Sequence, residues 1–316
     1  MIWGDYPIQV KETVFSASRL NLMLENDISL KHNVHIRGVN MNRLSLEDRA
    51  RILGCLVEGN SLRAITRMTG NSINTVTKLL VDLGTACGLY QNETLRNLPC
   101  KRLQLDEIWS FCYAKQKNVA PWRDAALGHG DVWTWTAICA DTKLVPTWLV
   151  GDRTAFYAKK FIADLAGRLA VRPQVTTDGL KLYLKPMEDT FGAGVDYAML
   201  VKMYGPSEGN QQERRYSSGS CTGAIKGTVS GDPDDRHVST SFVERQNLTM
   251  RMSMRRFARL TNGFSKKIEN HEHAIAIHYM YYNFGRIHKS LRVTPAMEAG
   301  VAKHVWTLEE IARLAD

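Results

Sequence analysis

Three carboxylate residues stand in sequence contexts that could bring them together around one catalytic site. Asp106 follows the apolar run Leu103–Leu105, and Asp178 follows the run Val175–Thr177. Each aspartate is therefore predicted at the end of a β-strand. Glu244 is predicted in the opening turn of a helix. Two strand-end aspartates and one helix-borne glutamate supply the oxygen ligands that Mg²⁺ prefers.

These ligands predict metal-dependent phosphodiester chemistry. Two Mg²⁺ or Mn²⁺ ions roughly 3.5–4 Å apart can activate a water molecule and stabilise the leaving oxygen. Each residue also has an ordinary explanation, because Asp is common at turns and an acid in the first helical turn favours the helix dipole. Their joint placement around one predicted sheet favours catalysis. Glu107 should point away from Asp106 on a strand, so only one of the two can face the site.

The elements that must position these residues suggest a mixed α/β core. Three strands, a helix and a fourth strand are predicted in that order over Leu103–Phe111, Val132–Ala140, Leu144–Leu149, Thr154–Leu169 and Val175–Thr177. An antiparallel hairpin that continues into a parallel β-α-β unit is the arrangement of a ribonuclease-H-like core. Residues 205–236 are rich in Gly, Ser and charge, which predicts a long surface loop.

A basic helix is predicted over Phe242–Lys267, followed by a second helix over Ile268–Asn283. The first contains seven basic residues and one acid. At about 100° per residue, several of its arginines fall near the line of Glu244. A phosphate backbone crossing the site would suit this stripe, and a solvated charged face is the alternative. Phosphate contacts are predicted at Arg245, Arg251, Arg255 and Arg259.

Residues 45–90 are predicted to form a helix-turn-helix domain. Serines at 45, 61 and 72 can cap helices over Leu46–Glu58, Leu62–Met68 and Ile73–Leu83. A tight Gly turn joins the last two helices. The polar residues Asn74, Thr75 and Lys78 of the last helix are predicted to contact DNA. A small helical bundle that touches no DNA is the alternative, and residues 1–44 give no functional prediction.

Composition is compatible with a nucleic-acid partner. The net charge is +9 with a pI near 9.2, which weakly favours a polyanionic ligand. The six cysteines form no CxxC pair, which argues against a zinc knuckle and predicts free thiols in a reducing cytoplasm. No signal peptide is evident, and no apolar stretch reaches the roughly 18 residues of a membrane span.

The chain resembles the DDE transposases of bacterial insertion sequences, most closely the insertion sequence one family. The residues that carry the resemblance are in segments 103–111, 177–183, 240–249 and 282–295. The resemblance implies a ribonuclease-H-like catalytic domain over residues 100–300, with 301–316 as a C-terminal tail. It also implies that Asp106, Asp178 and Glu244 hold two Mg²⁺ ions.

The same resemblance implies a reaction and its partners. The enzyme would cut double-stranded DNA at the terminal inverted repeats of an insertion sequence, expose a 3′-hydroxyl and direct it onto target DNA. It would act on DNA as a homo-oligomer of two or more copies. The rival functions are a non-catalytic helix-turn-helix DNA-binding protein and a structure-specific nuclease that cuts without joining.

Two further aspartates and a histidine stay open as site residues. The interval between Asp178 and Glu244 is 66 residues (244 − 178), which is long for the family. This leaves Asp141 and Asp196 as alternative second ligands. His237 could reach the scissile phosphate or the leaving group as an auxiliary residue, and a core or surface histidine is equally compatible.

Overall fold

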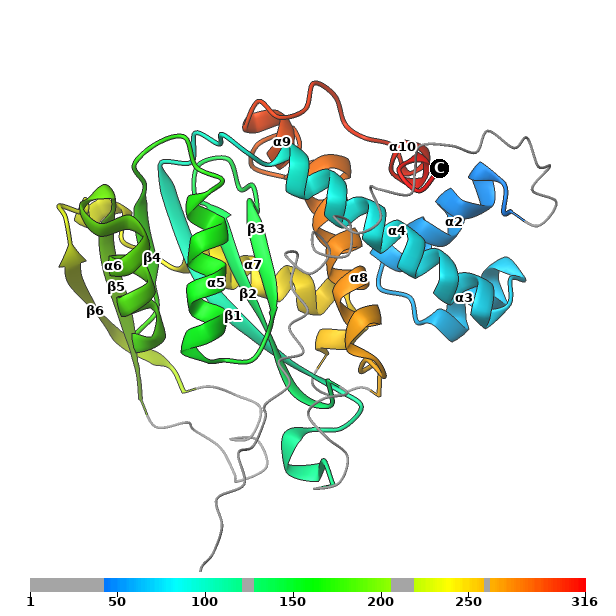
Figure 1. Cartoon of the computed structure of the whole chain (residues 1–316), viewed down its shortest axis with the longest axis horizontal. Helices are drawn as coiled ribbons and strands as arrows, with labels where there is room; N and C mark the ends of the chain where they lie inside the picture. Colours follow the sequence, from blue (N-terminus) through cyan, green and yellow to red (C-terminus); the bar gives the residue numbers. More distant parts are fainter. Residues whose placement is uncertain (1–42, 121–127, 206–218, 259–261) are drawn as a thin grey trace, which may run out of the picture.

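A six-stranded mixed sheet forms one half of the described structure, at the left of Figure 1, in the strand order β3-β2-β1-β4-β5-β6. The computed structural model describes residues 43–120, 128–205, 219–258 and 262–316. The strands are β1 (Arg102–Cys112), β2 (Gly130–Cys139), β3 (Thr147–Gly151), β4 (Gln174–Thr177), β5 (Asp196–Tyr204) and β6 (Cys221–Ser230).

The direction of the strands changes within the sheet. β1, β2 and β3 pair antiparallel in sequence order. Helix α5 (Ala155–Ala166) then returns the chain to β4, which pairs parallel with β1, and β5 pairs parallel with β4. The predicted antiparallel hairpin followed by a β-α-β unit is confirmed. Helices α5 and α6 (Leu184–Phe191) cover one face, and α7 (Ser241–Ser253) crosses the other (Figure 1).

The prediction of a surface loop over 205–236 was wrong in part, because the sheet continues there as β6. This strand pairs antiparallel with β5, although its sequence has little apolar alternation and most of its side chains are exposed. Backbone pairing with β5 thus overrides the weak local propensity.

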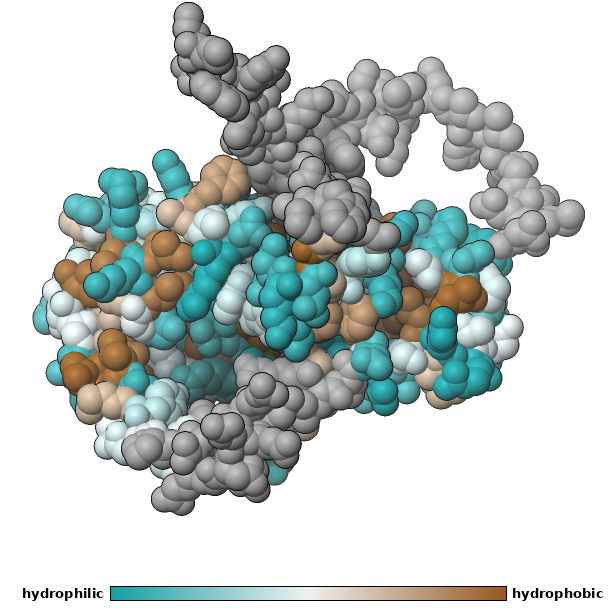
Figure 2. All heavy atoms as spheres, turned by 90° about the horizontal axis from the view of Figure 1, so that it is seen from below, coloured by the Kyte–Doolittle hydropathy of each residue, from teal (hydrophilic) through white to brown (hydrophobic). Residues whose placement is uncertain are grey.

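Figure 2 shows apolar residues gathered at this end of the molecule. Residues 206–218 lie outside the described residues. The exposed large apolar side chains of β5 and β6 are Val201, Met203, Tyr204, Ile225 and Val229.

The predicted helix over Phe242–Lys267 was also wrong, because α7 ends at Ser253. Met254 has an extended backbone (φ −137°, ψ 108°), and a short 3-10 helix, η8, follows over Arg255–Phe257. Tertiary packing gives the reason, since a Cβ on Gly59 would lie only 2.7 Å from the Ser253 carbonyl oxygen. The turn before α3 therefore occupies the space that another helical turn would need. Arg255 consequently leaves the line of Glu244.

Three helices lie beside the sheet: α2 (Leu46–Val57), α3 (Leu62–Thr69) and α4 (Ile73–Thr94). The three predicted serine caps are confirmed, because each hydroxyl accepts a hydrogen bond from the backbone N–H three residues later. Gly70 ends α3 in the left-handed region, with φ 74°. Helix α4 runs eleven residues beyond its predicted end at Leu83 (94 − 83), so the expected domain boundary at residue 90 falls inside a helix.

Helix α4 packs directly on α8 (Ile268–Met280), which continues as a π-helical turn over Tyr281–Gly285. A Cβ on Gly84 would lie 2.3 Å from the Cβ of His273, so only glycine fits this crossing. One hydrophobic cluster extends from α2 and α4 into the sheet. The helical part and the sheet therefore share a core.

The segment predicted as a C-terminal tail contains a helix. After α9 (Pro295–Glu298), helix α10 (Leu308–Arg313) packs on α2. Its start has a capping box made by Thr307 and Glu310. The terminal residue Asp316 bonds Arg49 and Arg43 at 2.6 and 2.7 Å. Within the described residues, no helix combines the length and apolar character needed to cross a membrane.

Candidate active site

Asp106 and Asp178 lie side by side on neighbouring parallel strands. The register of β1 and β4 pairs Leu105 with Thr177, so the residue after each is an aspartate at the same level. Neighbouring strands are about 4.8 Å apart, which brings the two carboxylates close. Asp178 follows the end of β4 as predicted. Asp106 lies mid-strand and not at a strand end, because β1 stays paired with β2 through Cys112.

Gln104 fixes the helix that carries Glu244 onto the same strand. Its buried side-chain oxygen accepts hydrogen bonds from the N–H groups of Phe242 and Val243, at 2.7 and 3.1 Å. These are orphan donors in the first turn of α7, and the N-cap Thr240 leaves them unsatisfied. Gln104 and Asp106 point to the same face of β1 because side chains alternate along a strand. The start of α7 is thus anchored two residues before Asp106.

The three carboxylates line one pocket of about 470 Å³. Asp106 comes from β1, Asp178 from the end of β4 and Glu244 from the first turn of α7. Arg251 also lines the pocket, because seven residues along α7 bring it back to within about 20° of Glu244. The predicted triad therefore shares one pocket in the folded chain.

Hydrogen bonds orient the Asp106 carboxylate. One oxygen accepts from the N–H of Glu107 at 2.8 Å, and the other accepts from the side-chain amide of the buried Asn247 at 2.8 Å. Burial still raises the pKa of Asp106 to about 6, and the charges of Asp178 and Glu244 add to this effect. A cation beside Asp106 would stabilise the charged carboxylate and lower its pKa.

Glu107 points to the opposite face from α7, as the strand alternation predicts. Its side chain is fully buried, where it accepts a hydrogen bond from the Tyr183 hydroxyl and one from the Arg153 guanidinium at 3.1 Å. Its pKa is raised to about 7, mainly by burial and in smaller part by the charges of Asp106 and Asp178. A fourth acidic group therefore lies beneath the triad.

Lys202 of β5 supplies a cation at the mouth of the pocket. Its ammonium contacts both carboxylate oxygens of Glu244 at 2.5 Å, and the Thr240 hydroxyl donates to one of them at 2.7 Å. Within the described ranges, no three His, Cys, Asp or Glu residues are drawn together closely enough to hold a metal ion. Both oxygens of the Glu244 carboxylate are therefore engaged by Lys202. The ligand types fit Mg²⁺, provided that Glu244 leaves Lys202.

The remaining predicted phosphate contacts are distributed over other surfaces. Arg245 lies about 100° round α7 from Glu244 and lines a separate pocket with Lys143 and Arg286. Arg255 lies in η8, beside a third cavity. Arg259 lies outside the described residues. Of the three described arginines, Arg251 is the one that lines the carboxylate pocket.

The structure places the auxiliary and alternative residues away from this pocket. His237 contacts the guanidinium of Arg102 at 2.6 Å, and Asp141 is paired with the same arginine. Asp196 begins β5 opposite Gln174, at the far end of the strand from Asp178. It is held by Arg172 at 2.5 Å. None of the three lines the pocket.

The predicted DNA-reading side chains start helix α4. Asn74 is exposed. The Thr75 hydroxyl is hydrogen-bonded to Ser72 at 2.9 Å, and the exposed Lys78 pairs with Asp82 at 2.5 Å. All three residues therefore lie in the first two turns of α4, the helix that follows the Gly70 turn.

Several site residues were missed in the sequence. Gln104 could have been found, since it is two residues before Asp106 and shares its strand face. Asn247 also had a signal, because it lies three residues after Glu244 on a helix. Lys202 had none, since its position depends on the pairing of β5 with β4.

No protein-family model matches the chain, and no curated protein matches it. Among solved structures, the chain is similar to a piggyBac transposase synaptic complex with hairpin DNA, with a TM-score of 0.35 and 12% identity, over 95% of this chain and 76% of that chain. It is also similar to a Mos1 transposase paired-end complex with the left transposon end, with a TM-score of 0.19 and 12% identity, over 57% of this chain and 67% of that chain. Function is inferred below from the geometry of the pocket.

Proposed function

We propose that this chain is a DDE-type DNA transposase of an insertion sequence, which cuts DNA and joins the cut end to a target. The observation that carries the proposal is the pocket that Asp106, Asp178 and Glu244 line together. Two of these residues are neighbours across a parallel strand pair, and the third is on a helix anchored to the same strand. This arrangement suits chemistry on a phosphodiester.

The sheet supports a ribonuclease-H-like core. Three antiparallel strands lie beside two parallel ones, and α5 makes the crossover from β3 to β4. In this proposal α3 and α4 form the helix-turn-helix that binds the ends of the element, through Asn74, Thr75 and Lys78. Further proposals are the cytoplasm of a bacterium or archaeon as the location and a homo-oligomer assembled on DNA as the active form.

Asp106, Asp178 and Glu244 would hold two Mg²⁺ or Mn²⁺ ions in this proposal. Such ions supply Lewis acidity and a water nucleophile activated at neutral pH. Asn247 and the Glu107 amide keep the Asp106 carboxylate oriented. Lys202 releases Glu244 and becomes available to a phosphate oxygen. Arg251 lies where it can contact the same phosphate.

The decisive experiment compares carboxylate variants on DNA that carries the ends of the element. Asp106→Asn, Asp178→Asn and Glu244→Gln should each reduce Mg²⁺-dependent cleavage by at least about a thousandfold, because each removes a ligand and its charge. Binding of the DNA should persist. Asp196→Asn is the matched control, since its carboxylate lies outside the pocket and is held by Arg172.

The products of the same assay separate the rival functions. A transposase joins the new 3′-hydroxyl to a target plasmid, whereas a structure-specific nuclease leaves cut ends unjoined. Wild-type protein that binds the ends but never cuts with either Mg²⁺ or Mn²⁺ would support a non-catalytic DNA-binding protein. Normal cleavage by Asp178→Asn would exclude the proposed triad.

A further inference from the structure

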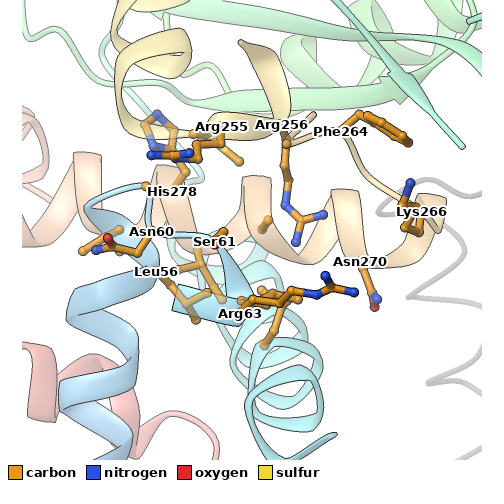
Figure 3. Close-up of a pocket in the computed structure, with 18 of the residues that line it drawn as sticks. Leu56, Asn60, Ser61, Arg63, Arg255, Arg256, Phe264, Lys266, Asn270 and His278 are labelled. Atoms are coloured by element: carbon orange, nitrogen blue, oxygen red, sulfur yellow. The ribbon is translucent and has the colours of Figure 1, made fainter. Parts of the chain in front are cut away.

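A cavity of about 710 Å³ lies between helices α2–α4 on one side and the segment from η8 to α8 on the other, away from the carboxylate pocket. One wall is the turn between α2 and α3 together with α3 itself. The other walls are η8, the chain from 262 to 266, and α8. Figure 3 shows Arg63 and Arg256 extending into this cavity from different elements. We call it the interhelical groove.

Among the described residues, the interhelical groove is lined by four cationic side chains and no acidic one: Arg63, Arg255, Arg256 and Lys266. None of the four forms a salt bridge within the part of the chain that the structure describes. His278 also lines the groove, and burial keeps its pKa at about 4, so it is neutral at physiological pH. Four like charges around one cavity repel one another unless an anion lies between them.

Arg256 is the most constrained of these cations. Its guanidinium donates to the hydroxyl of the buried Ser265 at 2.8 Å, and that hydroxyl also contacts His271 at 2.8 Å. Burial lowers the pKa of Arg256 to about 10. A neutral hydroxyl does not balance a partly buried guanidinium, whereas a phosphate oxygen would do so with a charge-assisted hydrogen bond.

We propose that the interhelical groove binds the phosphate backbone of duplex DNA through Arg63, Arg255, Arg256 and Lys266. This inference rests on the proposed function, which makes DNA the substrate. Its location supports the choice of ligand. Arg63 is on α3, the first helix of the proposed helix-turn-helix, and Arg255 follows the helix that carries Glu244. A cavity of this size admits the backbone of one strand and not a whole duplex, so the contacts would be to phosphates and would be independent of base sequence.

The test is DNA binding by the full-length chain without divalent metal, measured by fluorescence anisotropy over a salt series. Arg63→Ala with Arg255→Ala removes two exposed groove cations and leaves Arg256 bonded to Ser265. The matched control is Lys159→Ala with Lys185→Ala, which removes the same charge from α5 and α6 on the far face of the sheet. The groove variant should reduce the magnitude of the negative slope of log affinity against log salt by about 1.8 on duplex DNA, at about 0.9 for each phosphate contact. The control should leave the slope unchanged.

A groove variant that folds and keeps the wild-type slope overturns the proposal, as does a control variant that loses as much. A second arm adds inorganic phosphate to the wild type. If inorganic phosphate raises the melting temperature while the groove variant keeps its DNA slope, the groove holds a free phosphate and the proposal fails. Binding is measured without metal, so an absence of cleavage would count against the proposed function and not against the groove.

Discussion

The carboxylate pocket and the interhelical groove are two cavities lined by charges of opposite sign. The pocket gathers Asp106, Asp178 and Glu244 with a buried acid beneath them, and it balances them in part with Lys202. The groove gathers four cations, with no acid among the described residues that line it. Each is electrostatically incomplete without a ligand of the opposite sign. A metal ion suits the first and a phosphate backbone suits the second, and a nucleic-acid enzyme needs both.

The largest effect that would sharpen this contrast concerns the anchor of α7. Gln104→Ala removes the acceptor for two N–H groups at the start of the helix, so Glu244 should shift relative to Asp106. Mg²⁺-dependent cleavage should fall about a hundredfold, the usual result of a small misplacement of a catalytic group. DNA affinity in the absence of metal should stay unchanged. The matched control is Gln174→Ala on β4, whose amide bonds Asp234 and not α7; an equal loss there would remove the special role of Gln104.

A second test uses the pKa values of the acidic residues in the metal-free protein. The folded-state pKa is about 6 for Asp106 and about 7 for Glu107, against ordinary values of 3.8 and 4.5. Since both are raised, their contribution to stability is fully present below about pH 4 and is lost as pH rises through 6 to 7. The free energy of unfolding should therefore fall across this window.

Asp106→Asn should reduce that fall and stabilise the metal-free protein above about pH 7 by about 1–3 kcal/mol. Denaturant unfolding in the presence of a chelator measures the effect. Asp196→Asn should act in the opposite direction, because Arg172 lowers the pKa of Asp196 and so stabilises its charged form. An Asp106→Asn variant that is less stable than wild type above pH 7 would contradict the electrostatic account.

A third test separates the two regions along one stretch of chain. Arg251 lines the carboxylate pocket and Arg255 lines the groove, although they are only four residues apart. Arg251→Ala should slow cleavage about tenfold at saturating DNA, since one contact to the reacting phosphate contributes about 1.4 kcal/mol. Arg255→Ala should weaken binding and leave the saturated rate unchanged. Identical kinetic profiles for the two variants would mean that both regions act as one surface.

The smallest expected effect concerns base recognition by α4. Asn74→Ala should reduce the preference for the ends of the element over unrelated DNA about fivefold, because one base contact contributes at least about 1 kcal/mol. Competition binding measures the preference in the full chain. Thr77→Ala is the control, since its hydroxyl donates to the Ile73 carbonyl and is not available to a base. An unchanged preference in Asn74→Ala would mean that Asn74 does not contact bases.

The two regions also differ in what the sequence could predict. The three carboxylates of the pocket occur in recognisable local patterns, so their approach to one another, the order of the first strands and the serine caps were predictable, whereas Lys202 was not. Arg63, Arg255 and Lys266 come from segments that only tertiary packing brings together, so no local pattern indicated the groove. The end of α7 at Ser253 was missed for the same reason, because the turn at Gly59 blocks the next helical turn. Strand β6 was missed because its pairing partner, and not its own sequence, makes it a strand.

Because Gln104 binds the start of α7, the position of Glu244 beside Asp106 does not depend on the length of the chain that connects Asp178 to α7. The path from Asp178 to Glu244 takes 66 residues (244 − 178) through β5 and β6. The start of α7 is nevertheless bonded to β1 through the Gln104 amide oxygen, and Asn247 adds a bond to Asp106. A change in chain length between β5 and β6 would therefore leave the start of α7 bonded to β1, and with it the distance between Asp106 and Glu244. Related chains could gain or lose whole modules there while keeping the same chemistry.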